Sequence, residues 1–382
     1  MIKKLIEQKE KKVEYAELVY DLIFVYIVGR NNALLHHTED GFLSAEAFFT
    51  YFAFTLAVIQ IWNATTYYIN MYGRNSARDH IFLFSNMFLM YFLARGTRSD
   101  WQNYHMLYHI AWALVLVNIG MQYLIEQRHY HDDPAQKHRI SRTAVIQFCE
   151  AAFVTLAIAE FRLQGTTFLS IVAILFGMSA SLLIARARVS EIVDFEHLTE
   201  RAMLYVVLTF GEMIIAIAGY FDGDLTPRSL YFASLGFLIV VGLFLSYGAV
   251  FDRVIDRKMQ TNGLGYMFIH IFLILALNTT TATLEFMRFE EVDLVQKIAL
   301  MVGSLIVFFV FLFAATRYAR PGHRLSAGFY LLTGGISICF GGLMYLFREF
   351  NMVHIALTVS YVFIIFFILR AKIARSEKKE NT

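Results

Sequence analysis

Long apolar runs recur along almost the whole chain, and they constrain its fold more than any other feature. A helix needs roughly 20 mainly apolar residues to cross about 30 Å of hydrocarbon. Twelve segments have this character: 16–35, 43–69, 80–95, 104–125, 142–160, 166–185, 197–219, 230–250, 265–284, 295–316, 326–347 and 352–371. Pro134, Pro227 and Pro321 all lie between these segments, where a missing N–H interrupts no helix. The sequence therefore predicts an all-α, polytopic membrane protein with about twelve transmembrane helices.

The composition excludes several classes of protein. Hydrophobic residues make up 58% and charged residues 17% of the chain, whereas soluble domains are about half apolar and a quarter charged. The formal net charge of +2 is too small to indicate a nucleic-acid partner. Cys149 and Cys339 both lie inside apolar runs, so we expect neither a disulfide framework nor a Cys-ligated metal site. We expect the lipid bilayer as partner and no cofactor.

The lysines and arginines predict the orientation of the chain. If both termini are cytoplasmic, the inside segments hold 24 of these residues and the outside segments hold 8, with Arg201 inside the seventh run. An excess of Lys and Arg in cytoplasmic loops is typical of multi-pass membrane proteins. The sequence therefore predicts that both termini face the cytoplasm.

An even number of spans permits two parallel six-helix halves, an arrangement that many transporters share. We expect a basic cytoplasmic segment at 1–15, a first half at 16–190, a second half at 191–371 and a basic cytoplasmic tail at 372–382. A shift of 180 residues aligns run one with run seven. It places Asp21 opposite Arg201, and we predict an ion pair between them that joins the halves.

The same two runs contain specific motifs. Run one carries E-L-x-x-D-L-x-F-V at Glu17, Leu18, Asp21, Leu22, Phe24 and Val25. Run seven carries H-x-x-E-R and G-E at His197, Glu200, Arg201, Gly211 and Glu212. With these motifs the chain resembles the bacterial low temperature requirement protein A (LtrA) family, although Phe210 stands where the family usually has Leu. The resemblance implies a multi-pass protein of the bacterial cytoplasmic membrane, named for a cold-growth phenotype, with no settled molecular activity.

The polar residues of runs one and seven follow helical spacing. Glu17 and Asp21 are four residues apart, and a stripe in run seven includes His197, Arg201 and Glu212, with Glu200 beside it. One interpretation makes the stripe a wall of an ion or proton pathway. Another makes Glu17, Asp21, Glu200, His197 and Arg201 an ion-pair cluster between the halves that only holds helices together. A catalytic or metal-binding His197–Glu200 pair is disfavoured, because no second histidine follows at the required spacing.

Two further acids lack a basic neighbour on their own helix. Glu212 lies in run seven and Glu150 lies in the middle of run five. A charge at this depth costs roughly 2.5–3.5 kcal/mol and usually faces a partner or a hydrated cavity. We therefore expect Glu212, Glu150, Asp21 and Glu17 to line the pathway. For Glu150, a neutral acid held by a hydrogen bond is an equally good interpretation.

These features favour an ion channel or a proton-coupled transporter, with an ion or small solute passing between the two halves. Because no loop can hold a catalytic domain and no nucleophile or metal set is visible, we do not expect an enzyme. The alternatives are a membrane-embedded lipid-modifying enzyme and a non-transporting envelope factor in cold adaptation. Homo-oligomerisation stays open.

Overall fold

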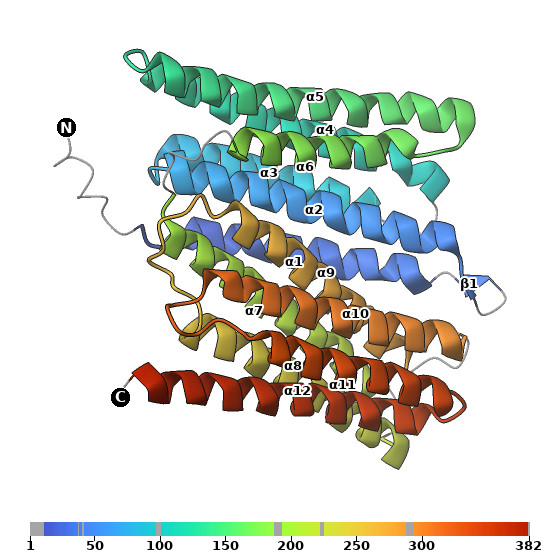
Figure 1. The fold of residues 1–382 in the computed structure, drawn as a ribbon. Coiled ribbons are helices and arrows are strands. Elements are labelled where there is room, and N and C mark those ends of the chain that lie inside the picture. The colour runs from blue at the N-terminus through green and yellow to red at the C-terminus, as the bar shows by residue number, and fades with distance from the viewer. Residues whose placement is uncertain are drawn as a thin grey trace. The chain divides into compact units, whose positions relative to one another are not determined.

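The computed structural model describes residues 11–36, 38–39, 42–96, 101–186, 193–221, 225–287 and 293–380 (Figure 1). Twelve α-helices make up most of this part of the chain: α1 (Tyr15–Asn32), α2 (Ala45–Tyr72), α3 (Ala77–Gly96), α4 (Trp101–Glu126), α5 (Pro134–Gln164), α6 (Phe168–Arg186), α7 (Phe195–Ala218), α8 (Pro227–Arg253), α9 (Leu264–Phe286), α10 (Leu294–Ala315), α11 (Ala327–Leu346) and α12 (Asn351–Glu380). Two short strands, β1 (Thr38–Glu39) and β2 (Phe42–Leu43), pair antiparallel before α2. Single-turn 3-10 helices follow α1, α4, α7 and α10: η2 (Ala33–His36), η3 (Gln127–His129), η4 (Gly219–Phe221) and η5 (Thr316–Tyr318).

The predicted fold class is confirmed. Each predicted apolar run forms a helix, and nine helices of the described chain are long and apolar enough to cross a membrane: α2, α4, α5 and α7 to α12. In α6 the apolar stretch is shorter, at Phe168–Ser181. Helix α1 is short for a span and carries three charged residues, Glu17, Asp21 and Arg30, within 18 residues. That α1, α3 and α6 also cross the membrane stays a prediction.

Capping residues explain where several helices begin and end. Helix α5 begins at Pro134, earlier than the predicted residue 142, because the Asp133 side chain accepts a hydrogen bond from the Gln136 N–H and proline suits the first helical position. The same helix ends at Gly165, whose φ of 69° is left-handed and whose N–H donates to the Phe161 carbonyl. The segment 126–141, between the fourth and fifth predicted runs, is therefore partly helical.

The chain divides into two compact units, and the division falls inside helices rather than at residue 190. Unit 1 contains α1 to α6, the first turns of α7 through Ala202, and the segment Gln260–Met267. Unit 2 contains Thr38–Ala45, Met203–Met259 and the chain from Phe268 onward. The two symmetric six-helix halves stay a prediction, and each unit is described separately below.

Within unit 1, α4 packs against α3 and α5, α5 packs against α6, and α1 packs against α3. Aromatic side chains fill the spaces between these helices. Phe54 of α2 stacks on Tyr108 of α4 with ring centroids 4.2 Å apart, a favourable offset arrangement for two buried rings. Within unit 2, α12 packs against α8 and α11, and Phe340 stacks on Tyr361 at 4.2 Å.

The hydroxyl groups in the polar segment of α9 are satisfied by bonds to the backbone of the same helix. Thr280, Thr281 and Thr283 donate to the carbonyl oxygens four residues earlier. Thr280 also bonds to Ser304 of α10 across 3.0 Å. These contacts satisfy the hydroxyls inside unit 2 and allow α9 to continue to Phe286.

Candidate functional site

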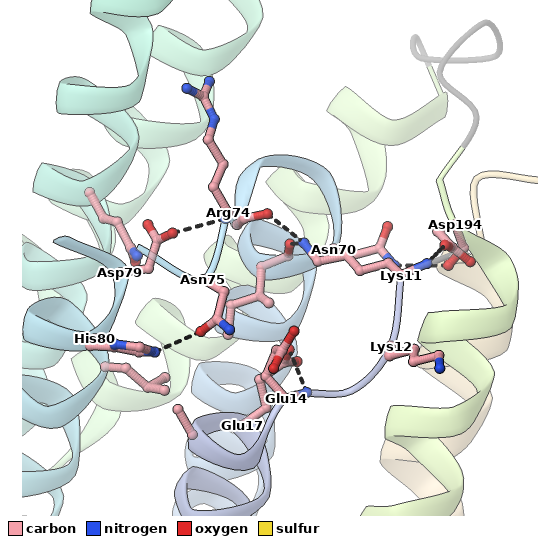
Figure 2. A pocket seen from close by; sticks show the side chains of 15 residues that line it. Lys11, Lys12, Glu14, Glu17, Asn70, Arg74, Asn75, Asp79, His80 and Asp194 are labelled. Atoms are coloured by element: carbon pink, nitrogen blue, oxygen red, sulfur yellow. Dashed lines mark hydrogen bonds between the residues drawn. The ribbon is translucent and has the colours of Figure 1, made fainter. Parts of the chain in front are cut away.

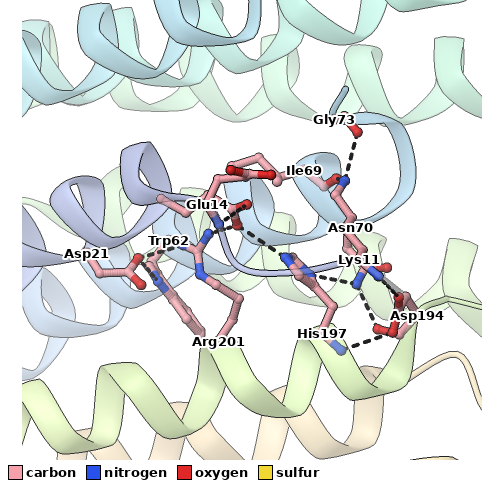
Figure 3. Close-up of polar contacts among 11 residues, drawn as sticks. Lys11, Glu14, Asp21, Trp62, Ile69, Asn70, Gly73, Asp194, His197 and Arg201 are labelled. Carbon is pink, nitrogen blue, oxygen red and sulfur yellow. Dashed lines mark hydrogen bonds and ion pairs between the residues drawn. The ribbon is translucent and has the colours of Figure 1, made fainter. Parts of the chain in front are cut away.

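The centre of the candidate site is Arg201, which lies in the second turn of α7 and is fully buried in unit 1. Its Nη1 pairs with Glu17 Oε2, and its Nη2 pairs with Asp21 Oδ1 at 2.6 Å (Figure 3). Because Glu17 and Asp21 are one turn apart on α1, both carboxylates can face one guanidinium. The flat fork of N–H groups on arginine suits this double contact. The structure thus contains the predicted Asp21–Arg201 ion pair, inside unit 1.

Trp62 of α2 also contacts Asp21, at the same oxygen as Arg201. The indole Nε1 donates to Asp21 Oδ1 across 2.9 Å. Both side chains are fully buried. Sequence reasoning missed Trp62, because no local pattern indicates which face of α2 meets α1.

His197 lies one turn before Arg201 and contacts the other carboxylate, with its Nε2 3.3 Å from Glu17 Oε2. The amide nitrogen of Asn70 lies 3.1 Å from His197 Nδ1 and also donates to the Asp194 carbonyl at 2.8 Å. An amide nitrogen only donates, so Nδ1 of His197 must accept. The proton of the neutral ring is then on Nε2, directed toward Glu17.

The start of α7 is tied to the N-terminal segment and to the end of α2. Asp194 accepts hydrogen bonds from the backbone N–H of His197 and of Lys11, each at 3.0 Å. The Lys11 ammonium donates to the carbonyl of Ile69, which also accepts the Gly73 N–H, and, at 2.8 Å, to the carbonyl of Gly73 at the end of α2. Burial lowers the pKa of Lys11 despite the nearby acids.

A pocket of about 850 Å³ lies beside this cluster in unit 1 (Figure 2). Polar side chains contribute most of its lining: Lys11, Lys12, Glu14, Glu17, Asn70, Arg74, Asn75, Asp79, His80, Gln122 and Asp194. Glu17 therefore belongs both to the pocket wall and to the ion-pair cluster around Arg201. Glu17 itself is 3% exposed, and its Oε1 accepts a hydrogen bond from the Glu14 N–H at 3.3 Å.

The other predicted pathway residues lie elsewhere. Glu150 of α5 is 1% exposed and accepts a hydrogen bond from Gln60 Nε2 of α2 at 2.9 Å. Gly177 of α6 packs so closely that a methyl group there would overlap both side chains. This close packing favours the interpretation of Glu150 as a hydrogen-bonded acid over a place in a hydrated pathway.

Glu212 and Glu200 do not join the described contacts of Arg201. Glu212 lies about three turns further along α7, in unit 2, and is half-buried. Its carboxyl group interacts electrostatically with that of Glu285. Glu200 is half-buried next to Arg201 in the sequence. Their assignment to the pathway and to the cluster stays a prediction.

A serine–histidine contact was not predicted from the sequence. His109 Nδ1 lies 2.7 Å from the His105 carbonyl, which only accepts, so His109 Nε2 is free to accept from Ser170 Oγ at 2.7 Å. Both side chains are at most 1% exposed. In the described part of the chain, no group of three or more metal-binding side chains is present.

The fold and this site define a polytopic helical membrane protein with a charged cluster buried beside a polar pocket. The chain belongs to the bacterial low temperature requirement A protein (LtrA) family, whose model matches residues 12–370. It is also 24% identical over 265 residues to an uncharacterized protein of Rhizobium meliloti (strain 1021). That match covers 66% of this chain and 62% of the relative, so the chain spans less than two thirds of the relative's length.

Proposed function

We propose that this protein is a proton-coupled transporter or ion channel of the bacterial cytoplasmic membrane, in which Glu17 binds the proton or cation. One observation carries the proposal. Glu17 lines the 850 Å³ pocket and at the same time pairs with the buried Arg201, which in turn pairs with Asp21. A group within reach of solution is therefore in direct contact with buried charges.

The charge balance of the cluster supports this role. Two carboxylates face one guanidinium, and the ring of His197 lies 3.3 Å from one of them. With both acids ionised, the two carboxylates and the guanidinium together carry one negative charge in excess, and excess charge is costly inside a membrane protein. One proton or one monovalent cation arriving through the pocket balances it.

Protonation of Glu17 also gives a route to conformational change. A neutral Glu17 no longer forms an ion pair with Arg201, which then keeps only Asp21 as its charged partner. The contact between α1 and the second turn of α7 weakens as a result. Differential stabilisation of two states by a bound proton is the basis of coupled transport.

Flux measurements on the full chain in liposomes test the proposal. A pH gradient across the membrane is imposed, and a dye trapped inside reports proton entry. We expect Glu17→Gln to reduce the pH-driven flux about tenfold or more, a factor that corresponds to about 1.4 kcal/mol. Wild-type flux no greater than that of empty liposomes, or full flux in Glu17→Gln, contradicts the proposal.

Glu126→Gln is the matched control. Glu126 is also buried and also pairs with two arginines, Arg74 at 2.8 Å and Arg78 at 2.6 Å. Its carboxylate is not among the pocket-lining groups named above. A loss of flux specific to Glu17→Gln separates a role in transport from the general cost of breaking a buried ion pair.

A second candidate function rests on the Ser170–His109 contact, which has the hydrogen bonding of an activated nucleophile. It favours a lipid-modifying enzyme, the main alternative to transport. Burial of both side chains argues against access of a substrate in this conformation. Turnover of phospholipid by the purified protein, abolished in Ser170→Ala, is the test.

The proposal includes the orientation of the chain in the membrane, with both termini in the cytoplasm. Lysine and arginine counts support cytoplasmic termini. Reporter proteins fused to each terminus, active only on one side of the membrane, check it. With a cytoplasmic N-terminus, the pocket beside Glu17 at the start of α1 opens to the cytoplasm, and an external N-terminus contradicts this part of the proposal.

A further inference from the structure

The polar pocket continues into a smaller apolar one on the outside of α1 and α3. This second pocket has a volume of about 360 Å³ and is lined by Glu14, Tyr15, Ala16, Val19, Asn75, His80 and Phe84. Four of these residues also line the polar pocket: Glu14, Ala16, Asn75 and His80. The two pockets therefore meet, and Glu14 lies where they do.

The apolar pocket belongs to a face that a bilayer would cover. Tyr15, Val19 and Phe84 are 87%, 46% and 51% exposed. Leu22 of α1 and Phe88 of α3 extend the same exposed apolar surface along the helices, at 54% and 62%. A soluble ligand gains little from such a surface, whereas an acyl chain lies along it naturally.

Most charged groups of the polar pocket are already held by the protein. Asp194 accepts two backbone N–H groups, and Asp79 accepts the N–H of Arg74 at 2.9 Å and that of Ser76 at 3.3 Å. Lys11 is bound by two carbonyls. Within the part of the chain that the structure describes, no such contact holds the Lys12 ammonium or the Glu14 carboxylate.

We infer that the paired pockets bind a phospholipid whose headgroup carries both a phosphate and a primary ammonium, as in phosphatidylethanolamine. Lys12 pairs with the phosphate, and Glu14 accepts hydrogen bonds from the ammonium. One acyl chain lies against Val19 and Phe84. Opposite charges in the polar pocket (Figure 2) thus match opposite charges in one headgroup. The apolar pocket distinguishes a lipid from a soluble compound of the same chemistry.

The chemistry predicts a clear order among lipids. A quaternary ammonium has no N–H to donate to Glu14, so phosphatidylcholine loses that hydrogen bond. Phosphatidylglycerol has no cationic group for Glu14 at all. Because a hydrogen bond to a charged group is stronger than a neutral one, we expect phosphatidylethanolamine to be retained about tenfold more than either lipid.

Native mass spectrometry of the full chain, mixed with equal amounts of the three lipids with identical acyl chains, measures this order. Glu14→Gln leaves only a neutral amide oxygen as the acceptor and therefore lowers the preference for phosphatidylethanolamine over phosphatidylcholine. Val19→Trp fills the apolar pocket and lowers the retention of phosphatidylethanolamine. Ile338→Trp, at a 79% exposed position of α11, is the control for an added indole ring and leaves retention unchanged.

Three results overturn the inference: equal retention of the three lipids by the wild type, an intact preference in Glu14→Gln, and displacement of the lipid by soluble phosphoethanolamine. The last result assigns the pocket to a free metabolite. If Val19→Trp does not fold, the lipid preference of Glu14→Gln alone tests the inference. The inference stands independently of transport, because lipid retention is measured without flux.

Discussion

Two buried acids of unit 1 show how differently a helical membrane protein can hold a carboxyl group. Asp21 is fully buried and contacts a cation, Arg201, at 2.6 Å. Glu150 is 1% exposed and bonds to a neutral amide, Gln60, at 2.9 Å. An ionised acid needs the first environment, whereas a neutral acid is satisfied by the second. The comparison teaches that burial alone does not mark a charged functional site.

The pocket sharpens this difference. Glu17 connects the Arg201 cluster to a polar cavity, whereas Glu150 is enclosed by Gln60 and Gly177. In the proposed function a proton therefore reaches the cluster through the pocket, without the opening of a helix. For Glu150 the surrounding side chains have to move first.

Arg201→Gln has the largest expected effect. It leaves Glu17 and Asp21 buried without their cation, and breaking a buried pair in this way costs about 3–5 kcal/mol in the free energy of unfolding. Denaturant titration of the purified protein in detergent measures the loss. Adding Asp21→Asn to Arg201→Gln restores part of the lost stability, because the two positions are coupled. If the double variant loses the sum of the two single losses, the ion pair is contradicted.

Asp21→Asn alone has the second largest effect. The asparagine oxygen still accepts from Trp62 Nε1, but Arg201 loses a charged acceptor. Hydrogen bonds to charged groups contribute about 1.5–3 kcal/mol, and we expect a loss of that size in the same titration. A loss as large as that of Arg201→Gln shows that Glu17 does not support Arg201 by itself.

Gly177→Ala tests the enclosure of Glu150. The added methyl group overlaps Gln60 and Glu150, and overpacking of this kind costs about 1–3 kcal/mol. Gly335→Ala in α11 is the matched control, since a methyl group there has nothing within 4 Å and alanine favours a helix. If the two variants are equally stable, the space around Glu150 is larger than the structure shows.

Sequence patterns predicted the helices well because hydropathy is a property of each segment alone. The Asp21–Arg201 pair could also be predicted, since both residues stand at matching positions of two recognisable motifs. Trp62, Asn70 and Gln60 could not, because all three lie on α2 and its packing face depends on contacts with distant helices. Gln60 is 90 residues from Glu150 in the chain, and no local spacing connects them.

Glu150→Gln has the smallest expected effect, and it is the strictest test of the comparison. If Glu150 is neutral, glutamine has nearly the same shape and still accepts from Gln60, so the free energy of unfolding changes by less than about 1 kcal/mol. If Glu150 is ionised, the change removes a charge-assisted hydrogen bond of about 1.5–3 kcal/mol.

Infrared spectroscopy of the wild type and of Glu150→Gln distinguishes these two cases directly. A neutral Glu150 contributes a carboxylic-acid carbonyl band that is absent from Glu150→Gln. An ionised Glu150 contributes a carboxylate band instead. The second result means that Glu150 is a buried charged group like the acids around Arg201, and it contradicts the comparison.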